Sequence, residues 1–291
     1  MDKHNDNGRF ISILSDYGFK VTFGNESDTT FIKKALQALI ESPVPIISVE
    51  FVKNEMSALT SDSRSGIYDL TCMDEKGNHF IVEMQLSQYP EFIHRMKFYG
   101  LHRFNTLIKK GDYKFENLPK IYCIGILAID IFPYINDYHN IGVLKNDKNE
   151  IIDDQMTYIT VELAKFTKQL PDIHTDLDKL IFTMKALHST TPPIQYPQFW
   201  DEEWLKIAIQ ELDTRAMTSE QRLQFEMTLS ANALAVKNEK RKIDKAILEE
   251  KIENIKKALL RGKLTIEEIA EDYNVDVDFV IDIQQKMDSS K

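Results

Sequence analysis

Two acidic residues and an amide are spaced in a way that could bind a divalent cation. Asp69 is followed after thirteen residues by Glu83, and one residue separates Glu83 from Gln85. Mg²⁺ and Mn²⁺ prefer carboxylate and carbonyl oxygens, so Asp69, Glu83 and the backbone carbonyl of Met84 are the expected metal ligands. Such a metal lowers the pKa of a bound water and neutralises charge on a phosphate as its P–O bond breaks. The alternative is a hairpin with a solvated polar face, which produces the same spacing.

Period-two alternation indicates how these residues are positioned. Between residues 79 and 86 the even positions are apolar, namely Phe80, Val82, Met84 and Leu86. Glu83 and Gln85 therefore share the opposite face of a strand. A three-residue loop over 75–77, with Gly77 in the left-handed conformation, would place Asp69 directly across from Glu83.

The surrounding pattern indicates an α/β domain. After a short aromatic entry segment and a helix that ends at Pro43, strands are expected over 46–55, 65–73 and 78–86, a helix over 91–110 and a buried strand over 121–130. A hairpin over 139–162 and a helix over 175–188 are expected next. We predict three parts: a catalytic-size domain over 1–190, a helical linker region over 191–236 and a C-terminal module over 237–291. The module is a charged helix in which Leu248, Ile252, Ile255 and Leu259 recur at coiled-coil spacing. A helix-turn-helix-like pair follows, with a capping box formed by Thr265 and Glu268.

Composition restricts the partners. The net charge is −10, so contact with DNA must be local rather than through bulk attraction. The segment 94–120 carries a local excess of five positive charges, which is either a DNA footprint or a solvated helix face. The longest apolar run, 121–129, is too short to span a membrane. The N-terminus has no apolar signal region and the two cysteines lie in apolar segments, so we expect a cytoplasmic protein.

The run SGIYDLTCMDEKGNHFIVEMQ resembles the signature of the PD-(D/E)XK nuclease family transposases, also called recombination-promoting nucleases. The segments LSDYGFKVTFG, EFIHRMKFYGLHRF, GDYKFENLPKIYCIGIL and LLRGKLTIEEIAEDYNV are similar to the same family. The resemblance implies a restriction-endonuclease-like core with a mixed central sheet and an all-helical C-terminal extension. It also implies a metal-dependent DNA endonuclease that acts in transposition or recombination of a bacterial mobile element.

Carried over to this chain, the resemblance implies that Asp69 and Glu83 bind the metal and that Gln85 takes the position usually held by lysine. Glutamine is neutral and can only hydrogen-bond the attacking water. The general base therefore stays open between a hydroxide on the metal and a substrate phosphate. A nuclease fold that has lost catalysis and serves as a DNA-binding or protein-interaction module is the alternative function.

Four further residues are candidates for DNA binding. Lys20 lies in the opening motif, where its role is either near the phosphate or in packing of the entry segment. Arg95, Tyr99 and Arg103 follow one another at one-turn spacing on a single helix face. Arg95 could bind a phosphate through two hydrogen bonds or pair with Glu83.

The C-terminal module is expected to bind a partner chain more than DNA. Its second short helix carries Asp276, Asp278 and Asp282, which would repel phosphates. We therefore expect residues 240–291 to mediate association, with a homodimer through the C-terminal helices as the candidate assembly.

Overall fold

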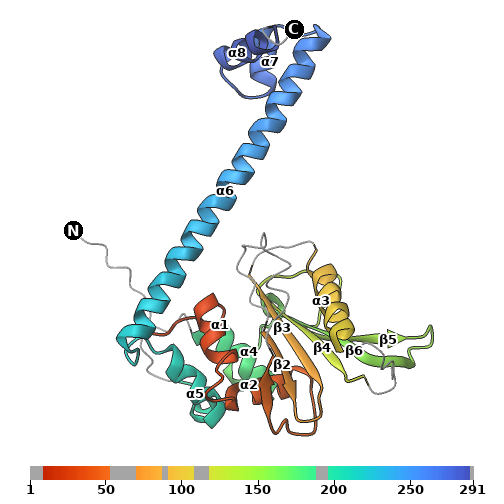
Figure 1. Cartoon of the computed structure of the whole chain (residues 1–291), viewed down its shortest axis with the longest axis vertical. Coiled ribbons are helices and arrows are strands. Elements are labelled where there is room, and N and C mark those ends of the chain that lie inside the picture. The colour runs from red at the N-terminus through yellow and green to blue at the C-terminus, as the bar shows by residue number, and fades with distance from the viewer. Residues whose placement is uncertain (1–8, 53–69, 87–90, 108–117, 188–195, 289–291) are drawn as a thin grey trace. The chain divides into compact units, whose positions relative to one another are not determined.

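The computed structural model describes residues 9–52, 70–86, 91–107, 118–187 and 196–288. By its internal contacts the chain divides into two compact units, one ending at Thr228 and one beginning at Leu229. The first unit is built around a sheet, and the second is helical (Figure 1). No helix within these described ranges combines the length and apolar composition needed to cross a membrane.

The strands of the first unit form one mixed sheet with the order β1-β2-β3-β4-β6-β5. Their bounds are β1 Val49–Phe51, β2 Leu70–Asp74, β3 His79–Gln85, β4 Ile121–Leu127, β5 His139–Lys145 and β6 Ile151–Glu162. The pairs β3–β4 and β4–β6 are parallel, whereas β1–β2, β2–β3 and β5–β6 are antiparallel. The predicted α/β class and its mixed central sheet are confirmed.

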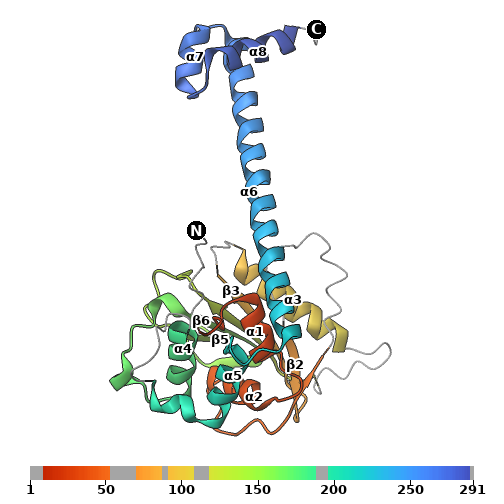
Figure 2. The same ribbon diagram turned by 90° about the vertical axis from the view of Figure 1, so that its left-hand side faces the viewer.

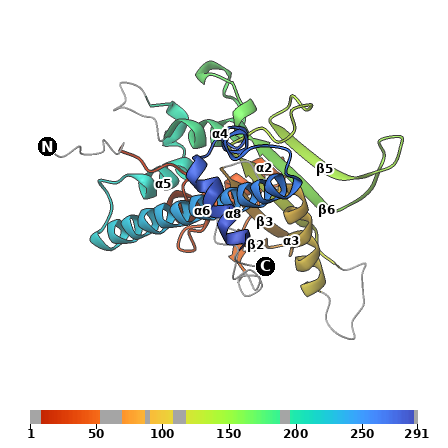
Figure 3. The same cartoon turned by 90° about the horizontal axis from the view of Figure 1, so that it is seen from above.

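Helices cover both faces of this sheet (Figures 1 and 3). One face is covered by α1 Asp16–Phe23, α2 Thr30–Leu39 and α4 Asp176–Ala186, and α5 Glu203–Leu212 packs on α1 and α2. The other face packs against α3 Phe92–Leu107. Short 3-10 helices occur at η3 Leu163–Lys165, η4 Leu170–Asp172 and η6 Gln198–Asp201. The strand β4 is accordingly apolar on both faces, as a central parallel strand requires.

The hairpin of β2 and β3 has the predicted three-residue loop. Gly77 adopts a φ of 80°, a conformation that costs glycine little because it has no Cβ. The Asp74 carboxylate accepts hydrogen bonds from the backbone N–H groups of Lys76 and Asn78 at 2.9 and 2.8 Å. This loop sets the register in which Leu70 is opposite Val82 and Cys72 is opposite Phe80.

The region predicted as a linker, 191–236, contributes to the core where the structure describes it. Trp204, Leu205 and Leu212 of α5 are buried in the main hydrophobic cluster. The division between the units falls within α6, after Thr228. Packing of the amphipathic helix α5 on α1 and α2 thus makes the described part of this region up to Thr228 belong to the sheet-containing unit.

The second unit comprises the larger part of α6 Ser219–Arg261, with α7 Ile266–Asp272 and α8 Val277–Asp288 (Figure 2). Gly262 follows α6 with a φ of 60°, and the predicted capping box of Thr265 and Glu268 is present. Ile255 is fully buried in a small core with residues of α7 and α8. The two short helices therefore pack onto the end of α6 through a core of their own.

Candidate active site

The strand β3 is buried along its whole length. Phe80, Val82 and Met84 point into the main core, so Glu83 and Gln85 lie on the face covered by α3. Their exposed fractions are 1% and 8%. A solvated polar face, which the spacing alone also allowed, is thereby excluded.

Helix α3 approaches the sheet closely beside Glu83. Gly125 of β4 is the register partner of Glu83. A Cβ on Gly125 would lie 2.6 Å from Cζ of Phe92 on α3, which is far inside van der Waals contact. The absence of a side chain at Gly125 is therefore what lets the first turns of α3 lie over the site.

Arg95 of α3 forms an ion pair with the buried Glu83 carboxylate. The same guanidinium donates a 3.0 Å hydrogen bond to the hydroxyl of Tyr99, one helical turn further on. Its Cζ lies 5.5 Å from the centre of the Tyr99 ring. Of the two roles considered for Arg95, the structure shows the pairing with Glu83. That pairing offsets the cost of burying a carboxylate.

Arg103, a further turn along α3, lies against the first residue of β3. Its Nε is 3.3 Å from Nδ1 of His79. Burial, reinforced by the Arg103 charge, lowers the pKa of His79 to about 4. His79 is therefore a neutral, packed imidazole at physiological pH.

The Cys123 thiol also lies near Glu83, but it is inert. Burial, with a smaller effect of the nearby Glu83 charge, raises the pKa of Cys123 to about 12. Only a thiolate is a good nucleophile or metal ligand. Cys123 thus contributes packing under α3 rather than chemistry.

The predicted metal ligands can be placed only in part. Asp69 lies outside the described residues. The prediction that it lies opposite Glu83 requires a hairpin register in which Leu70 pairs with Val82, and the structure has that pair. The carbonyl of Gln85 accepts from the N–H of Ala128 after β4, so the Met84 carbonyl is directed to the other side, towards β2. Within the described ranges no group of three or more acidic, histidine or cysteine side chains could hold a metal.

A sequence model of the PD-(D/E)XK nuclease family transposases matches residues 13–234. The match covers more than half of the 291 residues. The chain belongs to this family. Comparisons with curated proteins and with solved structures found no match. Family membership supports a nuclease or transposase-like role, and the matched range contains Asp69, Glu83 and Gln85.

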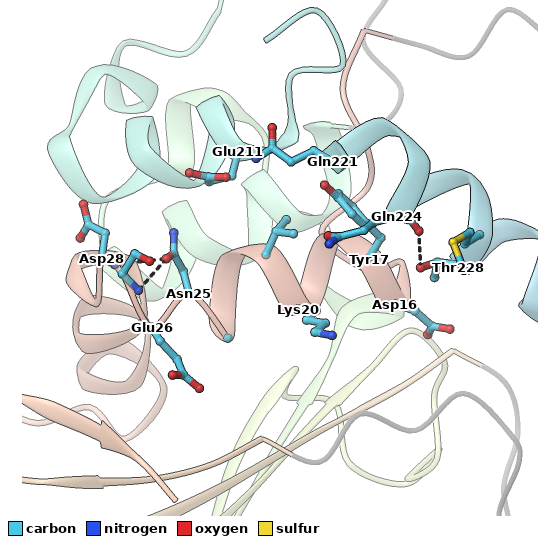
Figure 4. A pocket seen from close by; sticks show the side chains of 14 residues that line it. Asp16, Tyr17, Lys20, Asn25, Glu26, Asp28, Glu211, Gln221, Gln224 and Thr228 are labelled. Atoms are coloured by element: carbon cyan, nitrogen blue, oxygen red, sulfur yellow. Dashed lines mark hydrogen bonds between the residues drawn. The ribbon is translucent and has the colours of Figure 1, made fainter. Parts of the chain in front are cut away.

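Lys20 is the candidate DNA-binding residue of the opening motif. It lines a pocket of about 770 Å³ between α1, α5 and the start of α6 (Figure 4). Its side chain leaves α1 on the same side as that of Asp16, whereas Tyr17 points towards Gln224. Four carboxylates also line this pocket: Asp16, Glu26, Asp28 and Glu211. This surrounding negative charge opposes the binding of a phosphate beside Lys20.

The basic segment 94–120 of this transposase-family chain is largely engaged in intramolecular pairs where it is described. Arg95 and Arg103 contact β3, and Lys120 forms an ion pair with Asp154 of β6. Lys97 is exposed on α3. Lys109, Lys110 and Lys114 lie outside the described residues.

Two glycines that position α3 were not identified from the sequence. Besides Gly125, a Cβ on Gly100 of α3 would lie 2.8 Å from Sγ of Cys123. Glycine inside a helix or strand is unfavourable and often marks a close approach of two backbones. The available signal was the position of each glycine, Gly100 inside a predicted helix and Gly125 inside a predicted apolar strand.

Proposed function

We propose that the chain is a divalent-metal-dependent endonuclease that hydrolyses phosphodiester bonds in DNA during transposition or recombination of a mobile element. Family membership supports the nuclease class. The observation that carries the proposal is the burial of Glu83 beside Gln85 at the carboxyl end of β3, on the face opposite the main core.

The donor chemistry at this site fits a hard cation. Glu83 is a carboxylate with an exposed fraction of 1%, and a contacting cation offsets the cost of its desolvation. Arg95 is that cation in the structure, and a bound metal would take the same role. The Glu83 carboxylate and the Met84 carbonyl would hold Mg²⁺ or Mn²⁺ together with Asp69, whose place in the set is a sequence prediction. Once bound, the metal would act as a Lewis acid on the scissile phosphate.

The chain's own residues have separable tasks in this proposal. Gln85 follows Glu83 on the same face, so its amide orients the attacking water by hydrogen bonding, without adding positive charge. Arg95 neutralises Glu83 before the metal binds, and its guanidinium can then pair with a substrate phosphate. The Tyr99 hydroxyl, 3.0 Å from Arg95, positions that guanidinium.

The test is plasmid nicking by the purified chain with Mg²⁺ or Mn²⁺, and with EDTA added. We expect metal-dependent nicking that the substitution Glu83→Gln abolishes. The matched control is Glu162→Gln, which neutralises another fully buried, ion-paired glutamate, the one bound to Lys165 at 2.7 Å. This control should lose stability but keep nicking activity at temperatures where it is folded.

Retention of nicking by a folded Glu83→Gln variant would exclude this site as the catalytic centre. Equal activity after Asp69→Ala would exclude the expected ligand pair. Loss of activity in both glutamate variants would show that the assay reports stability rather than catalysis.

A second function, DNA binding or protein interaction without catalysis, is favoured by two specific features. Gln85 replaces the usual lysine, and Arg95 already occupies the Glu83 carboxylate. Calorimetric titration separates the functions, because a catalytic site takes up Mn²⁺ in a manner that depends on Glu83. If the chain takes up no Mn²⁺, and the Glu83→Gln variant binds DNA or protein as the unsubstituted chain does, the non-catalytic function is favoured.

A further inference from the structure

An apolar seam runs along the exposed surface of α6 in the second unit. Its positions alternate in steps of four and three residues: Leu229, Ala233, Val236, Lys240, Ile243 and Ile247. This is the spacing of a coiled-coil interface. Val236 is 70% exposed, Ile243 52% and Ile247 55%, so a hydrophobic face of regular spacing is left in water.

This seam differs from the coiled-coil-like spacing first noted in the sequence. Ile252, Ile255 and Leu259 belong to the small core that α6 forms with α7 and α8. These three side chains are therefore packed against other residues of the same chain. The seam from Leu229 to Ile247 precedes them on α6 and is the face that needs a partner.

We propose that the seam pairs with the same seam of a second copy of this chain, with the two α6 helices antiparallel. A parallel pair would place the two Lys240 side chains against each other in the interface, which like-charge repulsion disfavours. In an antiparallel pair centred on residue 238, Lys240 lies opposite Val236 of the second copy. Leu229 then lies opposite Ile247, and Ala233 opposite Ile243.

Charges beside the seam support the same orientation. Lys237 and Asp244 occupy equivalent flanking positions, each one residue after a seam position. In the antiparallel arrangement, flanking positions of this type face each other. Lys237 of each copy then faces Asp244 of the other, and the two-fold axis repeats this attractive pair.

The end of the seam offers additional apolar contact. A groove of about 370 Å³ lies beside Ile247, lined also by Leu248, Val275 and Phe279. Leu229 of the second copy, opposite Ile247, would reach this groove. The paired segment is roughly 27 Å long at 1.5 Å per residue, and burial in the groove extends the interface beyond the helix pair.

The test is the mass of the full-length chain in solution, measured by light scattering and sedimentation over a range of concentrations. We expect a dimer that Ile243→Lys converts to a monomer with an unchanged helical circular dichroism signal. The matched control is Leu234→Lys, because Leu234 is 59% exposed on the same helix but lies off the seam. A monomeric wild-type chain, or equal effects of the two substitutions, would overturn the proposal.

Orientation is tested by charge exchange and by cross-linking. Lys237→Glu should weaken the dimer, and the double change Lys237→Glu with Asp244→Lys should restore it. Chains carrying Val236→Cys should form a disulfide with chains carrying Lys240→Cys, but neither should do so efficiently alone. Efficient self-cross-linking of Lys240→Cys would instead establish a parallel pair and refute the antiparallel arrangement.

Discussion

Gly125→Ala should displace α3 and so disturb the contact between Arg95 and Glu83. The new methyl group would lie 2.6 and 2.7 Å from two ring carbons of Phe92, and 3.2 Å from Sδ of Met96. Carbon atoms pack at about 3.5–4.0 Å. The ring, or the helix that carries it, must therefore retreat by about 1 Å.

The expected cost follows from overpacking a buried site. Inserting one methyl group into a well-packed core typically destabilises a protein by about 1–3 kcal/mol. The upper half of that range is expected at Gly125, because the clash is with a fully buried aromatic ring and β4 is hydrogen-bonded to a strand on each side. A similar displacement of Arg95 should also lower any metal-dependent nicking.

Urea unfolding of the full chain measures the effect, with Gly142→Ala as the matched control. A Cβ on Gly142 of β5 would find its nearest neighbour, the Tyr158 carbonyl oxygen, at an ordinary 3.5 Å. Adding Phe92→Leu to Gly125→Ala should recover part of the loss, because the smaller side chain makes room for the methyl group. The double variant should then be more stable than the sum of the two single losses predicts.

Two results would refute this reasoning. One is a Gly125→Ala variant as stable as the Gly142→Ala control. The other is strict additivity of Gly125→Ala and Phe92→Leu, since residues that do not touch show no coupling. Either result would mean that α3 does not rest on β4 through this contact.

Three further predictions follow from the contacts around the site and the core. Arg95→Gln removes the ion pair with the buried Glu83 carboxylate and should destabilise the fold by about 3–5 kcal/mol. Added Mn²⁺ should recover part of the lost stability in thermal unfolding. If Mn²⁺ has no effect on the thermal unfolding of this variant, Glu83 does not bind the metal. The pKa of His79 is about 4 in the folded chain and about 6.5 in the unfolded chain. The unfolded chain therefore takes up the proton first, and the free energy of unfolding should fall between pH 6.5 and 4 by at most about 3 kcal/mol. His79→Gln should flatten this part of the pH profile. Hydrogen bonds that outweigh the effect of burial hold the pKa of Asp178 at about 2. Its contribution to the free energy of unfolding is therefore complete above about pH 4 and is lost as pH falls towards 2. A chain with Asp178→Asn should show a smaller loss of unfolding free energy over that range.

Much of the local structure could be predicted from residue order. Alternation in β3, the loop at Gly77 and the capping box at Thr265 each depend on residues within a few positions of one another. Local rules of this kind predicted the hairpin register and the face that carries Glu83 and Gln85. They also predicted a helix with Arg95 and Tyr99 on one side.

The assignment of partners could not be predicted in the same way. The sequence allowed Arg95 either to bind a phosphate or to pair with Glu83. The ion pair with Glu83 forms because α3 lies against β3 and β4 at this point. The spacing of Ile252, Ile255 and Leu259 indicated a coiled coil, yet those residues pack on α7 and α8 instead. Periodicity reports that a face is apolar but not which surface covers it.

The amino-acid sequence by itself therefore determined the strands, the helices, the side of the hairpin on which the acidic residue and the amide emerge, and the family. Tertiary structure decided that this side is buried under α3 and that an arginine neutralises the carboxylate there. The physical reason is that burial and charge pairing depend on contacts between segments distant in the chain. Here the decisive contact is the close approach of Phe92 to Gly125, more than thirty residues away.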